Sequence, residues 1–247
     1  MLTQALAVPG LGWMVLAILV AGLVRGFTGF GTALIFVPVA AQFLPAASVI
    51  LIMSTTGIFS TTALVPGAWK TADRGEVGVM ALAALLTVPL GLWTLAQLDG
   101  LVIRWMVTAV ASATLLAVIT GWRWHGRLGL PGRLAVGGAA GLVGGMTGLT
   151  GPMVIIFYLA NARSALAVRS NTILFLAALD VVLVANLFLR GQVEVTVLWV
   201  AVVLALPYLT TTLIGQALFD PRHENAYRIL AYGVVALAVI SGLPILD

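Results

Sequence analysis

Long apolar stretches without a charged side chain alternate with short charged segments along the chain. Residues 26–69, 134–162 and 195–219 each lack any charged side chain. A membrane-spanning helix needs about 20 mostly apolar residues to cross a hydrocarbon core about 30 Å thick. Because these stretches are continuous and do not alternate with polar residues, they predict helices rather than the strands of a β-barrel. We therefore expect an all-α polytopic membrane protein.

The composition of the 247-residue chain supports the same class. Hydrophobic residues make up 62% of it and charged residues 8%, whereas a soluble domain carries about 25% charged residues. This balance excludes an ordinary cytosolic enzyme, a disordered chain and a nucleic-acid binder. The chain has no cysteine, and its two histidines, His125 and His223, lie far apart, so we expect no metal and no cofactor. The amino-terminal apolar stretch has no Lys or Arg before it, which favours an uncleaved membrane segment over a signal peptide.

A ten-residue pattern occurs twice, near the start of each half. Residues 22–31 are GLVRGFTGFG, and residues 141–150, which begin 119 positions later, are GLVGGMTGLT. Six of the ten positions carry the same residue in both copies. The repeat predicts two copies of one unit within a single integral membrane domain. We place the first repeat at 1–122, a basic connecting loop at 123–133 and the second repeat at 134–247.

Each predicted repeat opens with a segment that glycine and threonine interrupt. Its arms are residues 11–24 and 32–44 in the first copy, and 134–143 and 152–161 in the second. As helices these arms would be about 15–21 Å long, too short to cross a membrane alone. We expect a re-entrant broken-helix hairpin followed by three transmembrane helices in each repeat. Those helices are expected at 46–65, 77–95, 101–121, 169–189, 195–217 and 227–241.

The distribution of basic residues predicts how the repeats are oriented. If each hairpin returns to its own side, each repeat crosses three times and the repeats are inverted. Nine basic residues then share one side and two lie on the other, whereas parallel repeats would divide them six against five. The larger excess favours two inverted repeats, although a full crossing by both hairpin arms would give the same distribution. The nine residues are Lys70, Arg74, Arg123, Arg127, Arg133, Arg163, Arg169, Arg222 and Arg228.

The two glycine-rich breaks are the candidate binding site. Inverted repeats with broken helices are typical of secondary transporters, whose substrates bind where interrupted helices expose backbone groups. A helix that starts after a break directs free N–H groups and a positive dipole end toward it, which suits an anion. Arg25 adds a permanent charge and a planar fork matched to carboxylate or sulfonate oxygens, and Gly144 replaces it in the second copy. The candidate substrate-binding residues are Arg25, Gly26, Thr28, Gly29, Gly31, Gly145, Thr147, Gly148, Thr150, Gly151 and Asn171.

A structural interpretation competes with each of these assignments. Glycines spaced four apart commonly allow close packing of membrane helices, and Gly137, Gly141 and Gly145 have that spacing. Arg25 would extend to the membrane surface if the hairpin were shallow, and Asn171 would suit a hydrogen bond between helices. The recurrence of glycine and threonine at both breaks favours a site. We expect Thr28→Val or Thr147→Val to lower anion binding without unfolding the protein.

Asp180 lies in the middle of an otherwise uncharged segment, between Arg169 and Arg190. A carboxylate within the membrane marks either a functional group or a buried polar contact. Two roles follow for Asp180: a proton-coupling group, or a structural partner of Arg25 or Arg169.

The duplicated glycine–threonine element, with short helices on both sides, resembles the TauE/SafE family of sulfite-exporter membrane permeases. The Ala162-Arg163 and Arg169-Ser170-Asn171 segments after the second copy are similar to that family as well. The resemblance covers essentially the whole chain. It implies a multi-pass carrier in a bacterial inner (plasma) membrane for sulfite, an organosulfonate or a related sulfur-containing acid.

We therefore expect a secondary transporter that moves a small anion by alternating access around the two breaks, with proton coupling through Asp180 left open. Its partners would be the small anionic substrate and the lipid bilayer. An anion channel-like pore and a transporter of a non-sulfur small carboxylate are the alternatives. We do not expect an enzyme, because the sequence has no Ser/His/Asp cluster, no metal-ligand spacing and no paired carboxylates in one segment.

Overall fold

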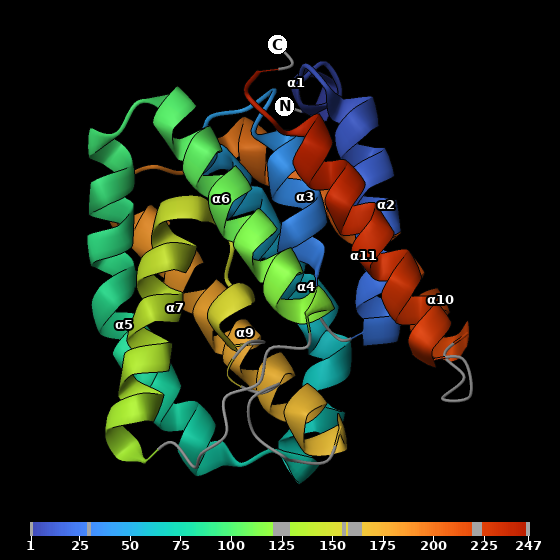
Figure 1. The fold of residues 1–247 in the computed structure, drawn as a ribbon. Helices are drawn as coiled ribbons and strands as arrows, with labels where there is room; N and C mark the ends of the chain where they lie inside the picture. The colour runs from blue at the N-terminus through green and yellow to red at the C-terminus, as the bar shows by residue number, and fades with distance from the viewer. Residues whose placement is uncertain are drawn as a thin grey trace.

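The computed structural model describes residues 2–28, 31–120, 129–154, 157, 165–218 and 224–245. The regular structure of these residues is helical throughout, which confirms the predicted all-α class. The helices pack side by side in one bundle, with both ends of the chain at the same end of it (Figure 1). They are α1 (Leu2–Leu6), α2 (Leu11–Thr28), α3 (Thr32–Ala40), α4 (Ala46–Thr71), α5 (Arg74–Gln97), α6 (Gly100–Ile119), α7 (Leu130–Thr147), α9 (Ala165–Leu189), α10 (Val195–Leu218) and α11 (Glu224–Ser241).

Several of these helices match the predicted membrane spans. Among the described helices, α5, α6, α9 and α10 are long and apolar enough to cross a membrane, and α4 makes a fifth if its two parts count as one span. Helix α4 bends by 71° between Ala46–Thr62 and Leu64–Thr71. Pro66 explains the bend, because its ring clashes with the carbonyl of Thr62 one turn earlier. These helices confirm a polytopic membrane protein.

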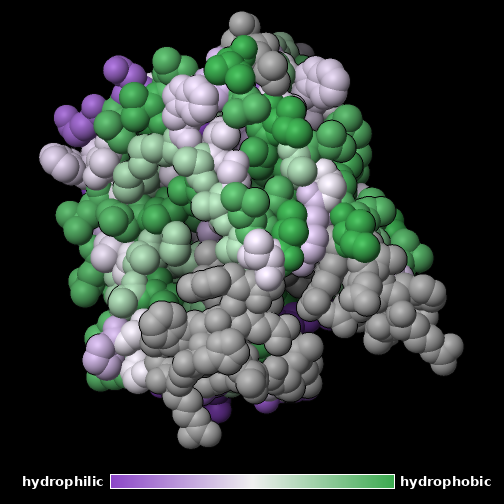
Figure 2. All heavy atoms as spheres, in the orientation of Figure 1, coloured by the Kyte–Doolittle hydropathy of each residue, from purple (hydrophilic) through white to green (hydrophobic). Residues whose placement is uncertain are grey.

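The outer surface of the bundle is apolar. Leu86, Trp93, Leu206, Ile229 and Leu237 all project outward, and each is more than half exposed. Figure 2 shows hydrophobic side chains across the middle of one face, with the most hydrophilic side chains mainly toward its ends. A surface this apolar is suited to lipid rather than to water.

The helix boundaries follow the offset of the sequence repeat. Helices α2 and α7 both have 18 residues, and Leu130 lies 119 positions after Leu11. Helices α4 and α9 begin at Ala46 and Ala165, which have the same offset. In Figure 1 the chain runs downward in α2 and α6 and upward in the corresponding helices α7 and α11.

The opening helix of each half packs against a helix of the other half. Helix α2 packs most extensively on α10, and its counterpart α7 packs on α5, while α4 and α9 pack against each other. Glycines make the first two contacts close. A Cβ atom on Gly26 would lie 2.5 Å from the Thr212 carbonyl oxygen, and one on Gly145 would lie 2.8 Å from that of Val88. Each opening helix is therefore fixed by the other half of the chain.

The opening arms are longer than the sequence predicted. The expected ends at Val24 and Val143 are wrong, because α2 continues to Thr28 and α7 to Thr147. Eighteen residues give each helix a length of about 27 Å, which is close to the thickness of a hydrocarbon core. Gly26 and Gly145 do not end these helices, and both lie at close contacts with a neighbouring helix, α10 and α5 respectively. Helix α7 also begins within the predicted loop 123–133, at Leu130.

The second arms of the hairpins are short. Helix α3 has nine residues and is buried along nearly its whole length, which makes it about 14 Å long. In the second half, residues 152–154 and 157 are helical, and the rest of the predicted arm at 152–161 lies outside the described residues.

Candidate functional site

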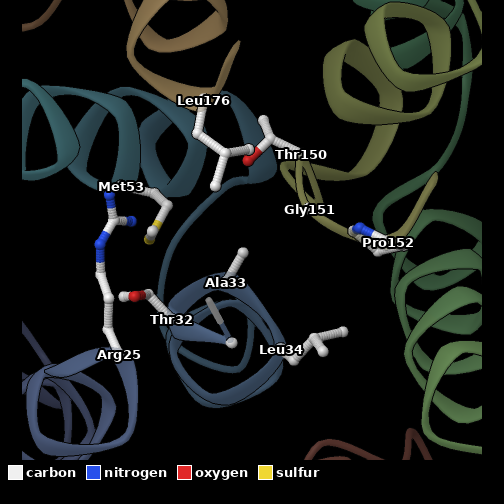
Figure 3. Close-up of a pocket in the computed structure, with 10 residues that line it drawn as sticks. Arg25, Thr32, Ala33, Leu34, Met53, Thr150, Gly151, Pro152 and Leu176 are labelled. Atoms are coloured by element: carbon white, nitrogen blue, oxygen red, sulfur yellow. The ribbon is translucent and has the colours of Figure 1, made fainter. Parts of the chain in front are cut away.

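A small cavity lies where the two helix breaks meet. The breaks are 119 residues apart in sequence, yet each supplies part of the same wall. Figure 3 shows Arg25 and Thr150 on opposite sides of this space, with the start of α3 between them. The lining residues are Arg25, Gly31, Thr32, Ala33, Leu34, Met53, Thr150, Gly151, Pro152 and Leu176. Four of the sequence-predicted residues, Arg25, Gly31, Thr150 and Gly151, are therefore brought together.

The first break presents the start of a helix to the cavity. Gly31 precedes α3 with φ of 97°, in the left-handed region that favours glycine. The first turn of α3, from Thr32 to Leu34, then forms part of the cavity wall. The first N–H groups of a helix have no partner within it and carry a partial positive charge. This wall can therefore donate hydrogen bonds to an anion.

Arg25 is the charged residue of the cavity. It lies on α2 and only 3% of its surface is exposed. Its Nε and Nη2 atoms are buried without a hydrogen-bond partner in the part of the chain that the structure describes. A buried guanidinium with free donors is costly unless something pairs with it. Its position and free donors make it the strongest candidate among the cavity residues for binding an anion.

Tyr208 supports both Arg25 and the start of α3. It is fully buried on α10, and its hydroxyl is 2.7 Å from the Thr32 hydroxyl. The guanidinium carbon of Arg25 lies 6.0 Å from the centre of the Tyr208 ring, a distance at which a cation–π attraction operates. Sequence reasoning missed Tyr208. Its signal was a tyrosine inside an uncharged stretch, whose hydroxyl needs a partner when it is buried.

Asp180 lies beside Arg25. It is 3% exposed, Ser54 is its side-chain hydrogen-bonding neighbour, and the charge of Arg25 acts on it. No ion pair within 4.0 Å joins the two charged groups in the described structure. Gly57 faces the carboxylate, which occupies the space that a side chain at Gly57 would need. Of the two partners predicted for Asp180, Arg25 is the one whose charge acts on it.

The second break is shaped by its own hydrogen bonds. Gly148 ends α7 with φ of 75°, and its N–H donates to the Gly144 carbonyl at 2.8 Å. The Thr147 hydroxyl donates to the Val143 carbonyl at 2.7 Å and accepts from the Leu149 N–H at 3.2 Å. Thr147 and Gly148 therefore form the turn and do not line the cavity.

Other predicted residues lie away from the cavity or outside the description. Gly26 and Gly145 lie at the close helix contacts described above, in agreement with the packing interpretation of such glycines. Thr28 is the last residue of α2, and its side chain is not described. Gly29 lies outside the described residues.

Asn171 belongs to a separate polar cluster near the start of α5. It accepts a hydrogen bond from the Asp73 N–H at 2.8 Å and donates one to Glu76 at 3.2 Å. Glu76 is 1% exposed and pairs with Arg133 on α7 at 3.3 Å. The cluster links α5, α7 and α9, which agrees with the interhelical interpretation of Asn171. Among the described residues, no three His, Asp or Glu side chains come together as a metal site.

Long apolar helices around two facing helix breaks define the class of this chain: a multi-pass α-helical membrane transporter. A family model described as "Sulfite exporter TauE/SafE" matches residues 14–242, across both halves. The chain belongs to the TauE/SafE family, as its sequence motifs predicted. No curated protein and no solved structure matches the chain. Membership of a transporter family agrees with the expectation that the chain is not an enzyme.

Proposed function

We propose that this protein is a secondary transporter of a small sulfur oxyanion, sulfite or an organosulfonate, and that the anion binds between the two helix breaks. The observation that carries the proposal is Arg25, a buried guanidinium with free donors in the cavity wall. The planar guanidinium, with its paired N–H donors, suits the oxygens of a sulfite or sulfonate group. The first turn of α3 and the Thr150 hydroxyl supply further donors from both breaks.

The size of the cavity supports alternating access rather than an open pore. About 20 Å³ is open to the centres of water-sized molecules, which is room for about one water molecule. An oxyanion needs more space, so the helix breaks have to separate for it to bind. We infer that the structure corresponds to a closed form between two open ones.

We further propose two inverted repeats, 1–122 and 134–247, in a bacterial inner membrane. The opposite directions of corresponding helices in Figure 1 support inversion. The nine-to-two distribution of basic residues supports it independently. The short helix α3, buried between the longer helices, supports a re-entrant hairpin in the first repeat.

Proton coupling through Asp180 is part of the proposal. A carboxylate beside Arg25 competes with the substrate for the same positive charge, so a proton on Asp180 would favour anion binding. Transport that binds an anion and a proton together follows from this competition.

Flux into liposomes that contain the purified full-length protein tests the proposal. We expect sulfite uptake to saturate with concentration and to respond to an imposed proton gradient. Arg25→Gln should weaken sulfite binding about 10- to 100-fold, because hydrogen bonds to charged groups are the strong ones. Arg74→Gln is the matched control, since Arg74 is exposed at the start of α5, where its guanidinium lies over Trp69.

Each other outcome favours a different conclusion. Flux that rises linearly to high concentration would indicate a channel-like pore. A preference for acetate or malonate over sulfite would favour a carboxylate transporter. Wild-type affinity in Arg25→Gln, with the protein still monodisperse, would remove the cavity as the binding site.

A further inference from the structure

The cavity has an unusually simple charge balance. Among the described residues that line it, Arg25 alone carries a charge. The start of α3 adds a partial positive charge of roughly half an elementary charge. The wall therefore offers between one and two positive charges to a ligand, all of them on the side of the first break.

Asp180 opposes that charge from one turn farther along α9 than the cavity-lining Leu176. Leu176 lines the cavity on α9, and Asp180 follows it by four residues, on the same face of the helix. On α4, Met53 lines the cavity and the adjacent Ser54 contacts the carboxylate. Arg25 lines the cavity and its charge also acts on the buried acid, so a ligand and Asp180 draw on the same charge.

Formal charges limit the ligand, because the partial charge at the start of a helix contributes much less than a buried unpaired ion costs. With Asp180 ionised and the cavity empty, the two buried side chains sum to zero. An anion with one negative charge restores that balance only if Asp180 takes up a proton. A dianion would leave a surplus negative charge in a buried place even then, and uncompensated buried charge is strongly unfavourable.

We infer that the site takes a singly charged sulfur oxyanion, hydrogensulfite or an alkylsulfonate, together with a proton on Asp180. This inference rests on the proposed function and adds to it the charge of the substrate and the stoichiometry of one proton per anion. Proton and anion binding are then linked, and each strengthens the other by the same factor.

The other ionisable groups near Asp180 lie farther along its neighbours. Helices α4 and α5 pack against α9. On α4 the charged residue is Lys70, exposed near the helix end, and on α5 the charged residues are Arg74 and Glu76 in the first turn. Glu76 contacts Asn171, which precedes Asp180 by nine residues, or about 13 Å along α9. Among the described residues, Arg25 on α2 is thus the charge that a proton on Asp180 would affect most directly.

Isothermal titration of the purified full-length protein with methanesulfonate and sulfate tests the inference. Methanesulfonate carries one charge and sulfate two over the neutral range, so any change with pH reports on the protein. We expect methanesulfonate to bind at least about tenfold more tightly than sulfate, and to bind about tenfold more tightly near pH 6 than near pH 8.

Asp180→Asn should keep methanesulfonate binding tight at both pH values and remove the pH effect. Asn186→Ala is the matched control, because Asn186 is on the same helix and its side chain donates to the Val182 carbonyl of that helix at 2.9 Å. The control should retain the wild-type pH effect. Asp180→Glu should retain it too, since it keeps an ionisable group at that position.

Two results would overturn the inference. Equal affinity for sulfate and methanesulfonate in the wild type would contradict the single charge, and this comparison needs no variant to fold. An unchanged pH effect in Asp180→Asn would contradict the role of Asp180. Absence of binding by both anions, together with absence of sulfite flux in liposomes, would instead overturn the proposed function.

Discussion

The two helix breaks share one sequence pattern but do different things. At the first, Arg25 stands on the preceding helix, and Gly31 introduces a buried helix whose start faces the cavity. At the second, Gly144 stands in place of Arg25, and Thr147 uses its hydroxyl to shape its own turn. The left-handed glycines, Gly31 and Gly148, also fall at positions that do not correspond in the repeat.

The repeated pattern alone does not distinguish residues that pack helices together from residues that bind the ligand. The difference between the two breaks separates these two roles. The shared glycines determine where helices cross closely and where they end. In the proposed site, ligand chemistry comes from residues that the repeats do not share, namely Arg25 in one half and Asp180 in the other. A duplicated unit can thus provide similar helix packing in both halves while the charged residues of the site differ between them.

The largest effect is expected on stability, at the corresponding glycines Gly26 and Gly145. Gly26→Ala and Gly145→Ala should each lower the free energy of unfolding by about 1–3 kcal/mol, because the added Cβ meets backbone of the facing helix. Thermal unfolding in detergent, followed by fluorescence, measures this. A large loss of stability in one variant and none in the other would show that the helix contacts at Gly26 and Gly145 are not equivalent.

Gly78→Ala serves as the control for this pair. Gly78 is on α5, and a Cβ there would meet no atom within 4 Å. Alanine is the better helix former by up to about 1 kcal/mol, so this variant should be as stable as the wild type or slightly more so.

The next effect distinguishes the two threonines of the second break. Thr147→Val should cost about 1 kcal/mol of stability and leave anion affinity unchanged, because its hydroxyl is already bonded within the turn. Thr150→Val should leave stability unchanged and weaken anion binding roughly fivefold, because Thr150 lines the cavity. Unfolding and titration measured on both variants check this, and a reversed result would exchange their roles.

Much of the fold could be predicted because charges are so rare in this chain. Most charged segments lie at or near helix ends, and the predicted start of the helix at 195 is the observed one. The end of α2 could not be predicted in the same way. Gly26 suggests a break in sequence, but it continues the helix because α10 packs against it.

The site was harder to predict than the fold. Arg25 and Asp180 stood out as charges within apolar segments, yet their proximity depends on how α2, α4 and α9 pack. No local pattern encodes contacts between residues that lie so far apart in the chain. Tyr208 was missed for the same reason, since its partner Thr32 is 176 positions away.

A smaller effect is expected at Tyr208. Tyr208→Phe keeps the ring below Arg25 but removes the hydrogen bond to Thr32, which should weaken anion binding about threefold. Tyr227→Phe is the control, because its hydroxyl donates to the Leu218 carbonyl instead. Titration with methanesulfonate should show the loss in the first variant alone. Equal affinities would mean that the hydroxyl of Tyr208 has no part in holding α3 at the site.

The smallest effect tests the link between the first break and Asp180. Gly57→Ala should leave the protein folded, because the atoms that the new Cβ meets are the movable carboxylate of Asp180. Displacing that carboxylate from Arg25 should weaken their interaction, so the pH effect on methanesulfonate binding should fall by about twofold. Gly67→Ala lies on the same helix in open space and should leave the pH effect unchanged. If the two alanine variants gave the same pH effect, Asp180 would act on the anion without depending on its position beside Arg25, and a general electrostatic influence would replace the competition proposed above.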